Sequence, residues 1–321
     1  MSIERCSPLK HQLDRLLPEF GPLPPTSLLS IPKSSSHLNS VTGKSGEAQA
    51  VEQRLPESSA SSSAGVGAGD DGGHEQARVS ARRAVLVNRA LLRLMHLASF
   101  LAGRTVFDSA YYRESELTRL MNLFAHVDLD RWRGMQVLEV GAGPGRLGDA
   151  FVRLGFSVTS SDGRPEHVDA LRARGRNAFV IDLDRTPVDA SGEFDLILAF
   201  GVLYHLAQPA FFLRGCRKAK VLLLETAVHD NFAPVLQTVR ESGGWRSQDQ
   251  SVSRVGTRPS PRWVEEQCRD AGFDSVRDIS SSLGDWSIGS FDWEARGLGE
   301  WRREGTNLRK MWVCERQSRD E

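Results

Sequence analysis

The sequence predicts an α/β fold with a mostly parallel β-sheet, on the basis of three observations. Val137, Leu138 and Val140 form a short apolar run, which is typical of a strand buried on both faces. A glycine-rich turn over residues 141–145 follows this run, and residues 145–154 then show the spacing of an amphipathic helix. Strand-like and helix-like segments alternate along the rest of the chain, as they do in proteins with parallel sheets.

The N-terminal part of the chain differs from the rest. Residues 1–80 are rich in proline, serine and glycine, so they bury too little apolar surface to offset chain entropy and are predicted to be disordered. A partner-binding tail and a dispensable leader both fit this composition, and we favour the second. Two helices, Ala84 to Leu101 and Glu114 to His126, are predicted before the sheet, with residues 107–112 between them.

The elements of the sheet region follow in order. Strands are expected at residues 135–140, 157–161, 178–182, 194–200, 221–225, 274–279 and 310–315. Helices are expected at residues 145–154, 165–174, 209–216, 231–241 and 261–271. Ser260 and Pro261 suit the N-cap and the first position of the last helix. Residues 280–308 carry three tryptophans and form a long connection, which is either a lid over a cleft or a small satellite core.

Composition restricts the classes of function. The 41 Lys and Arg residues balance 41 Asp and Glu residues, so no overall basic field favours nucleic acid or a membrane. The four cysteines form no C-x-x-C pair, which indicates a reducing, cytoplasmic location and neither a metal site nor a disulfide framework. No signal peptide is visible. The most apolar stretch, residues 84–102, contains two arginines, which favours an amphipathic helix over a membrane span.

The glycine turn is a candidate binding site for an anionic group. Gly141, Gly143 and Gly145 allow positive φ angles and a close approach of a ligand to the backbone. The helix that follows presents free N–H groups and the positive end of its dipole, which suits a carboxylate or a phosphate. The pattern G-x-G-x-x-G of dinucleotide-binding proteins is also present, from Gly143 to Gly148, but it begins two residues late relative to the strand.

Asp162 is the next candidate, at the end of the second predicted strand. It lies one strand–helix–strand unit after Glu139, where a carboxylate can accept both ribose hydroxyls of an adenosine cofactor. Enzymes that use nicotinamide cofactors and enzymes that use S-adenosylmethionine share this arrangement, so Asp162 alone does not choose between them. An N-cap for the helix at residues 165–174 is the structural alternative.

Four segments, in this order, resemble the successive motifs of class I S-adenosylmethionine-dependent methyltransferases: residues 139–145, Asp162, residues 181–184 and residues 194–206. The resemblance covers about residues 105–316. It implies a Rossmann-like three-layer sandwich with a seven-stranded, mostly parallel sheet, whose antiparallel last strand lies beside the fifth. Together with the elements predicted above, it gives one methyltransferase domain over residues 81–321: N-terminal helices (81–130), a cofactor-binding core (131–279), an insertion or lid (280–308) and the last strand (309–316).

The resemblance assigns roles toward S-adenosylmethionine by position. The glycines at 141, 143 and 145 surround the methionine end, and Glu139 orders the turn or the cofactor's amino group. Asp162 holds the ribose. The remaining cofactor-binding residues that the resemblance implies are Asp182 and Leu183 at the adenine, and Phe200 and Gly201 on the methionine side.

Transfer of a methyl group from a sulfonium is an in-line displacement, so most of the rate comes from alignment of the reactants. A hydroxyl acceptor also needs a base, which contributes about 10²–10⁴-fold. His205 is the candidate base, because it follows the tip of the fourth strand, and its neighbour Tyr204 could orient the acceptor. A purely structural strand-to-helix corner is the alternative for this pair.

Weaker candidates lie in other loops. His229 and Asp230 occupy the loop after the fifth strand and could contact the substrate. Tyr111 and Tyr112 either fold over the cofactor or pack. The arginines in residues 254–262 either bind an anionic acceptor or belong to a loop, and Asp184 is expected on a solvated loop.

We therefore expect a methyltransferase that acts on an oxygen or nitrogen of a small molecule. A tRNA-modifying methyltransferase is an alternative, because residues 201–206 resemble a segment of wobble-uridine modification enzymes. A catalytically silent interaction protein and, more distantly, a nicotinamide oxidoreductase are further alternatives. No membrane partner is expected, and the sequence does not identify the acceptor or the oligomeric state.

Overall fold

The structure is a computed structural model that describes residues 106–108, 110–241, 250–280, 291–300, 302–303 and 306–317. The predictions for the tail at residues 1–80 and for the helix from Ala84 to Leu101 lie outside these residues, as do residues 281–290, 301 and 304–305 of the connection 280–308. Among the described helices, none has the length and apolar character that a membrane span requires.

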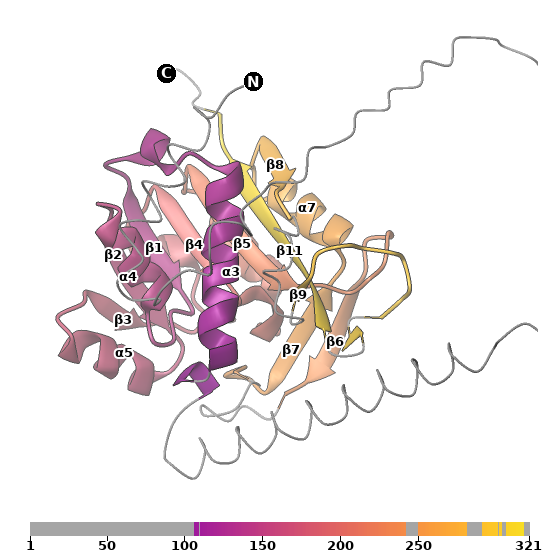
Figure 1. The fold of residues 1–321 in the computed structure, drawn as a ribbon, viewed down its shortest axis with the longest axis horizontal. Coiled ribbons are helices and arrows are strands. Elements are labelled where there is room, and N and C mark those ends of the chain that lie inside the picture. The colour runs from indigo at the N-terminus through magenta and orange to yellow at the C-terminus, as the bar shows by residue number, and fades with distance from the viewer. Residues whose placement is uncertain are drawn as a thin grey trace, which may run out of the picture. The chain divides into compact units, whose positions relative to one another are not determined.

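The described strands form a central sheet that is mostly parallel (Figure 1). Its parallel part has the order β3–β2–β1–β4–β5, with bounds Ala178–Val180, Ser157–Asp162, Gln136–Val140, Leu196–Phe200 and Val221–Ala227. The long strand β11 (Thr306–Glu315) runs antiparallel beside β5, and β8 (Ser275–Asp278) runs antiparallel beside β11. These seven strands confirm the predicted topology. Two short strands that pair with β11, β9 (Phe291–Asp292) and β10 (Arg302–Arg303), bring the described total to nine.

Helices cover both faces of this sheet. The side chains of Leu196 and Leu198 on β4 enter a hydrophobic core shared with α3 (Ala110–His126) and α4 (Arg146–Arg153), and Figure 1 shows α3 crossing one face of the sheet. The alternate residue Ile197 enters a second core shared with α6 (Pro209–Gly215) and α7 (Pro261–Asp270). Helix α5 (Pro165–Ala173) packs on β2 and β3. The three-layer sandwich is therefore confirmed.

The site is positioned by the parallel register of β1, β2, β4 and β5. Val140 pairs with Ser161, and Phe200 pairs with Glu225, so these strands end at the same edge of the sheet. The glycine turn, Asp162 and the segment after Phe200 follow directly from those ends. Ligands of open α/β sheets bind at this carboxyl edge.

Most predicted boundaries agree with the structure to within two residues, because they were set by local signals. The N-cap of α7 is confirmed, since the Ser260 hydroxyl accepts a hydrogen bond from the Trp263 N–H at 3.3 Å. Helix α3 begins at Ala110, earlier than predicted, after the short 3₁₀ turn η3 (Val106–Asp108). Three further 3₁₀ turns are η4 (Leu129–Trp132), η5 (Val188–Ala190) and η6 (Leu203–His205).

The helix predicted at residues 231–241 is wrong. This segment contains the strand β6 (Leu236–Arg240), which pairs antiparallel with β7 (Val255–Pro259) in a separate two-stranded sheet. Most side chains of β6 are exposed, so the strand has no apolar stripe that a sequence pattern could reveal. Pro234 lacks the N–H that a helix interior needs. Pairing with β7 therefore decides the conformation.

Candidate active site

The glycine turn after β1 needs glycine for both conformation and space. Gly141, Gly143 and Gly145 have φ angles of +63°, +52° and +75°, in the left-handed region that side chains rarely adopt. A Cβ atom on Gly141 would lie 2.6 Å from Cγ2 of Val202. The turn thus keeps its backbone bare at the edge of the sheet, and Gly145 leads directly into α4.

Asp162 lies against this turn. Its Oδ2 accepts a hydrogen bond from the Gly143 N–H at 2.8 Å, and its Oδ1 accepts one from the Arg164 N–H at 2.9 Å. His167 Nδ1 is 3.3 Å from Oδ1. A carboxylate has about four acceptor positions, so capacity for ribose hydroxyls remains. The N-cap residue of α5 is Arg164, so the alternative role of Asp162 as the N-cap is wrong.

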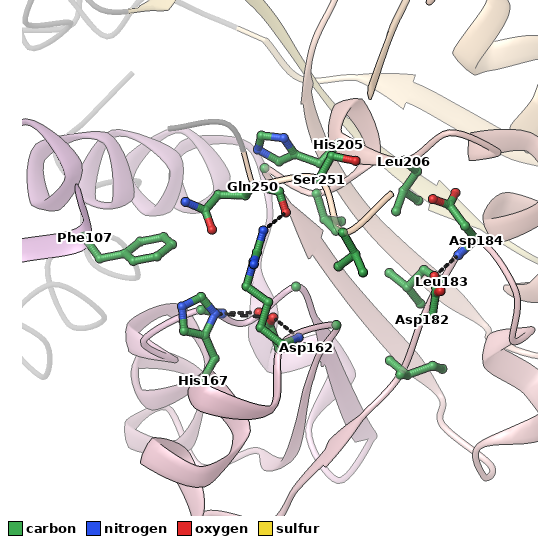
Figure 2. Close-up of a pocket in the computed structure, with 18 of the residues that line it drawn as sticks. Phe107, Asp162, His167, Asp182, Leu183, Asp184, His205, Leu206, Gln250 and Ser251 are labelled. Carbon is green, nitrogen blue, oxygen red and sulfur yellow. Dashed lines mark hydrogen bonds and ion pairs between the residues drawn. The ribbon is translucent and has the colours of Figure 1, made fainter. Parts of the chain in front are cut away.

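A single pocket of about 650 Å³, partly open to solvent, joins these groups (Figure 2). Its wall comes from the tips of β1 to β4, from η6, from the N-terminal segment and from residues 250–252. The lining residues are Phe107, Tyr112, Gly141, Gly143, Asp162, Gly163, Arg164, His167, Ile181, Asp182, Leu183, Asp184, Gly201, Val202, His205, Leu206, Gln250, Ser251 and Val252.

The pocket contains most, but not all, of the residues predicted for the site. Those in its wall are Gly141, Gly143, Asp162, Asp182, Leu183, Gly201 and His205. Those that are not part of the wall formed by the described residues are Glu139, Gly145, Phe200 and Tyr204. Phe200 is buried in the core beside α3, because alternate residues of β4 face opposite sides of the sheet.

Glu139 lies beneath the turn. Its Oε1 accepts from the Gly148 N–H and its Oε2 from the Ser160 hydroxyl, each at 2.8 Å. Burial raises the pKa of Glu139 to about 7, although both hydrogen bonds favour the ionised form. The carboxylate therefore links β1, β2 and the first turn of α4. Of the two roles predicted for Glu139, this position suits ordering of the loop.

His205 is paired with a residue that the sequence did not reveal. Its Nδ1 lies 2.6 Å from Oε2 of Glu241, which follows β6 and is 4% exposed. The Ser251 N–H donates to the same oxygen at 3.1 Å, and Arg258 Nη1 lies 3.5 Å from Oε1. Among the described residues, Nε2 of His205 has no hydrogen-bond partner. The signal was missed because only the β6–β7 pairing brings Glu241 here.

The charges in this corner favour neutral His205 and ionised Glu241. Burial lowers the pKa of His205, Glu241 opposes that shift, and Arg258 and Arg309 add to it. Burial alone would raise the pKa of Glu241, but the hydrogen bond from His205, the Ser251 N–H and the charge of Arg258 together lower it.

Tyr204 supports His205 from outside the pocket. The two rings lie 3.9 Å apart between centroids. The guanidinium groups of Arg258 and Arg309 lie 5.1 and 4.8 Å from the Tyr204 ring centroid, and Arg309 Nη2 donates to the Tyr204 hydroxyl at 3.1 Å. Of the arginines in residues 254–262, Arg258 is buried in this cluster, whereas Arg262 pairs with Glu266 on α7 at 3.0 Å.

A buried arginine lies behind the pocket wall at Gly201. Arg119 Nε on α3 donates to Oε2 of Glu225, and Arg309 Nη1 donates to Oε1, each at 2.7 Å. A Cβ atom on Gly201 would lie 3.0 Å from Arg119 Nη2. Two arginines facing one glutamate leave a net positive charge beside the pocket. Sequence reasoning missed Arg119, since the helical pattern of α3 carries no sign of this contact.

The weaker candidates separate into pocket and scaffold residues. Tyr112 lines the pocket. The centroid of the Phe107 ring lies 4.6 Å from that of the Tyr112 ring and 5.3 Å from that of the His167 ring. The side chain of Tyr111 lies outside the described part of the chain. Asp184 is not on a solvated loop, because it lines the pocket and accepts from the Gln208 N–H at 2.7 Å.

His229 and Asp230, in the loop after β5, are not part of the pocket wall that the described residues form. The Asp230 carboxylate is buried and accepts from the N–H groups of Arg296 and Gly297 at 2.7 and 2.8 Å. It therefore anchors the segment before β10. The His229 side chain is also buried. Trp293 packs in the main core beside α3 and not in a separate satellite core, while Trp286 and Trp301 lie outside the described residues.

The central part of the chain is similar to known methyltransferases. Residues 138–220 match the family model of a methyltransferase domain. Ubiquinone biosynthesis O-methyltransferases of Cereibacter sphaeroides and Methylocella silvestris are 32% and 36% identical over 92 and 88 residues, which is 27% and 26% of this chain. The matches span only 37% and 34% of these relatives.

Solved structures are similar at lower identity. The N-terminal domain of EvdMO1 with SAH bound has a TM-score of 0.44 at 19% identity, covering 57% of this chain and 74% of that one. The Burkholderia thailandensis 1,6-didemethyltoxoflavin-N1-methyltransferase has a TM-score of 0.40 at 19% identity, covering 79% and 94%. At these TM-scores the similarity carries no functional argument.

The matched residues run from β1 to the residue before β5, the part of the chain that carries the glycine turn, Asp162 and His205. The strand order, with an antiparallel strand beside β5, agrees with the resemblance seen in the sequence. Residues 138–220 are therefore a methyltransferase domain, and the sheet around them has the strand order implied by the resemblance to class I S-adenosylmethionine-dependent methyltransferases.

Proposed function

We propose that this protein transfers a methyl group from S-adenosylmethionine to an oxygen or nitrogen atom of a small molecule. The observation that carries the proposal is that one pocket contains the glycine turn, Asp162 and His205. These supply, in one place, a bare backbone, an acceptor for hydroxyls and a base. The relatives to which this chain is similar are O-methyltransferases, which transfer a methyl group to an oxygen atom, and this supports the proposal.

The residues present fit the cofactor. The backbone of Gly141 and Gly143 would approach its methionine end, with the positive charge of Arg119 behind Gly201 favouring the carboxylate there. Asp162 would accept the ribose hydroxyls, and Asp182 and Leu183 would contact the adenine, as the resemblance implies. When bound, S-adenosylmethionine supplies a methyl group already activated on a sulfonium.

The remaining work of the protein is alignment and proton removal. Phe107 and Tyr112 close the N-terminal side of the pocket, and residues 250–252 close the side of the β6–β7 sheet. Such walls restrict the orientation of an acceptor and exclude water. Alignment of the reactants accounts for most of the rate of methyl transfer. His205 lies in the same wall with a free Nε2 among the described residues and would act as the base.

The structure lends no specific support to the alternative of tRNA as acceptor. Arg258 is buried against Tyr204, and Arg262 pairs with Glu266 on the surface of α7. Neither presents an uncompensated charge to a phosphate backbone, and of the three candidate arginines only Arg254 is exposed without an ion pair among the described residues.

Two measurements test the proposal. Isothermal titration calorimetry of the purified chain should show saturable binding of S-adenosylmethionine, and incubation with methyl-labelled cofactor and a cell extract should label a small molecule. No heat of binding would refute the proposal. Binding without any labelled product would instead favour a catalytically silent protein, and label retained on tRNA would favour the nucleic-acid alternative.

A further inference from the structure

We infer that His205 and Glu241 form a proton-accepting pair, which makes a hydroxyl group, a phenol or an enol, the natural methyl acceptor. This inference rests on the proposed function and narrows it from an oxygen or nitrogen acceptor to a hydroxyl. It also gives the β6–β7 sheet a role, because that sheet brings Glu241 to the pocket.

Glu241 is held in one place by contacts from several directions. Its carboxylate meets His205 at 2.6 Å, the Ser251 N–H at 3.1 Å and Arg258 at 3.5 Å. Strand β7 passes close to η6 at Gly256, where a Cβ atom would lie 2.6 Å from the Tyr204 carbonyl oxygen. The same Cβ atom would overlap Oε1 of Glu241, so the absence of a side chain at Gly256 lets the carboxylate reach the histidine.

This arrangement selects one tautomer of His205. A carboxylate only accepts hydrogen bonds, so Nδ1 carries the proton toward Glu241 and the lone pair is on Nε2. Nε2 has no partner among the described residues, and His205 lines the pocket. Figure 2 shows the His205 ring on the opposite side of the pocket from Asp162. A lone pair in this position can accept a proton from a bound acceptor.

The surrounding charges suit a base that works at neutral pH. Glu241 faces His205 from the end of β6, Arg258 from β7 and Arg309 from β11, and the Tyr204 ring packs at a tilt against the His205 ring. Burial and the two arginines keep the imidazole neutral at rest. The carboxylate stabilises the imidazolium once it forms, as an orienting carboxylate does in other histidine bases.

The reaction balances with these groups. The acceptor oxygen forms a bond to the methyl carbon while the carbon–sulfur bond breaks, and the electron pair of that bond stays on sulfur. The hydroxyl proton moves to Nε2 of His205 and later leaves to solvent. A ring nitrogen with a lone pair needs no such base, whereas a hydroxyl does, so the pair indicates a hydroxyl acceptor.

The first test uses nitrogen NMR of the His205 imidazole in the full chain to measure its tautomer and its titration midpoint. The wild type should show the Nδ1–H tautomer. Glu241→Gln keeps an oxygen near Nδ1 but removes the charge, so the titration midpoint of His205 should move to lower pH. The exposed Glu266→Gln on α7 is the matched control and should leave the midpoint unchanged. An Nε2–H tautomer in the wild type, or an unmoved midpoint in Glu241→Gln, would overturn the inference.

The second test identifies the methylated atom. Product labelled by S-adenosyl-[methyl-¹⁴C]methionine in a cell extract should carry an O-methyl group by mass spectrometry, and Glu241→Gln should form it more slowly, by up to about 10²–10⁴-fold. Calorimetric binding of S-adenosylmethionine should stay as in the wild type. An N-, S- or C-methyl product, or an unchanged rate, would contradict the pair. If the wild type does not bind S-adenosylmethionine, the proposed function is refuted. The NMR test would then still show whether His205 and Glu241 form the inferred pair.

Discussion

Replacement of Asp162 by alanine tests the cofactor site most directly. The Asp162 carboxylate accepts from the Gly143 N–H at 2.8 Å and from the Arg164 N–H at 2.9 Å, and it faces the pocket where the ribose would lie. Alanine removes both the acceptor for the ribose hydroxyls and the acceptor that fixes the glycine turn. The prediction is a large loss of affinity for S-adenosylmethionine.

The magnitude follows from the hydrogen bonds at stake. A hydrogen bond to a charged group contributes about 1.5–3 kcal/mol, so two bonds to the ribose amount to about 3–6 kcal/mol. Since about 1.4 kcal/mol is a tenfold change in affinity, Asp162→Ala should weaken binding by at least about 100-fold. Asp162→Asn keeps one acceptor oxygen and should lose less, about tenfold.

Isothermal titration calorimetry is the assay, with thermal unfolding of the ligand-free protein as a check on the fold. Asp169→Ala is the matched control, because Asp169 lies on α5 with an exposed carboxylate 3.8 Å from Arg172. The control should bind as the wild type does. If Asp162→Ala binds within about threefold of the wild type, the ribose role of this carboxylate is wrong.

Three further changes have defined outcomes. Gly141→Ala should lower stability by about 1–3 kcal/mol, because a positive φ and a contact with Val202 both oppose a Cβ atom, and Val202→Ala should recover only part of the loss in thermal unfolding. Glu139 has a folded pKa of about 7, above the usual 4.5, so its contribution to stability is present at acid pH and is lost as pH rises from about 5 to 7, by roughly 3 kcal/mol. Unfolding midpoints of Glu139→Gln should lack that decline, and an identical pH profile would contradict the shift. His205→Gln should slow turnover by about 10²–10⁴-fold while calorimetric cofactor binding is unchanged, and equal loss of both would show a structural role.

Local signals explain why much of the fold could be read from the sequence. The apolar run at residues 137–140 lies in a strand buried on both faces, as its pattern predicted. The glycines that follow adopt positive φ, and Ser260 caps α7. Parallel strands end at one edge, so the proximity of Asp162 to the turn followed from the alternation of strands and helices alone.

The pairs that complete the site depend on contacts between distant segments. Glu241 reaches His205 only because β6 pairs with β7, and the exposed side chains of β6 carry no pattern that foretells that pairing. Arg119 reaches Glu225 from a separate helix. The helix predicted at residues 231–241 was wrong because pairing with the distant strand β7 decides the conformation of that segment. Periodicity, turn residues and caps act within a few residues, so the sequence by itself determined the strands, the turn and the edge that holds the pocket. Which charges meet there was decided by packing in three dimensions.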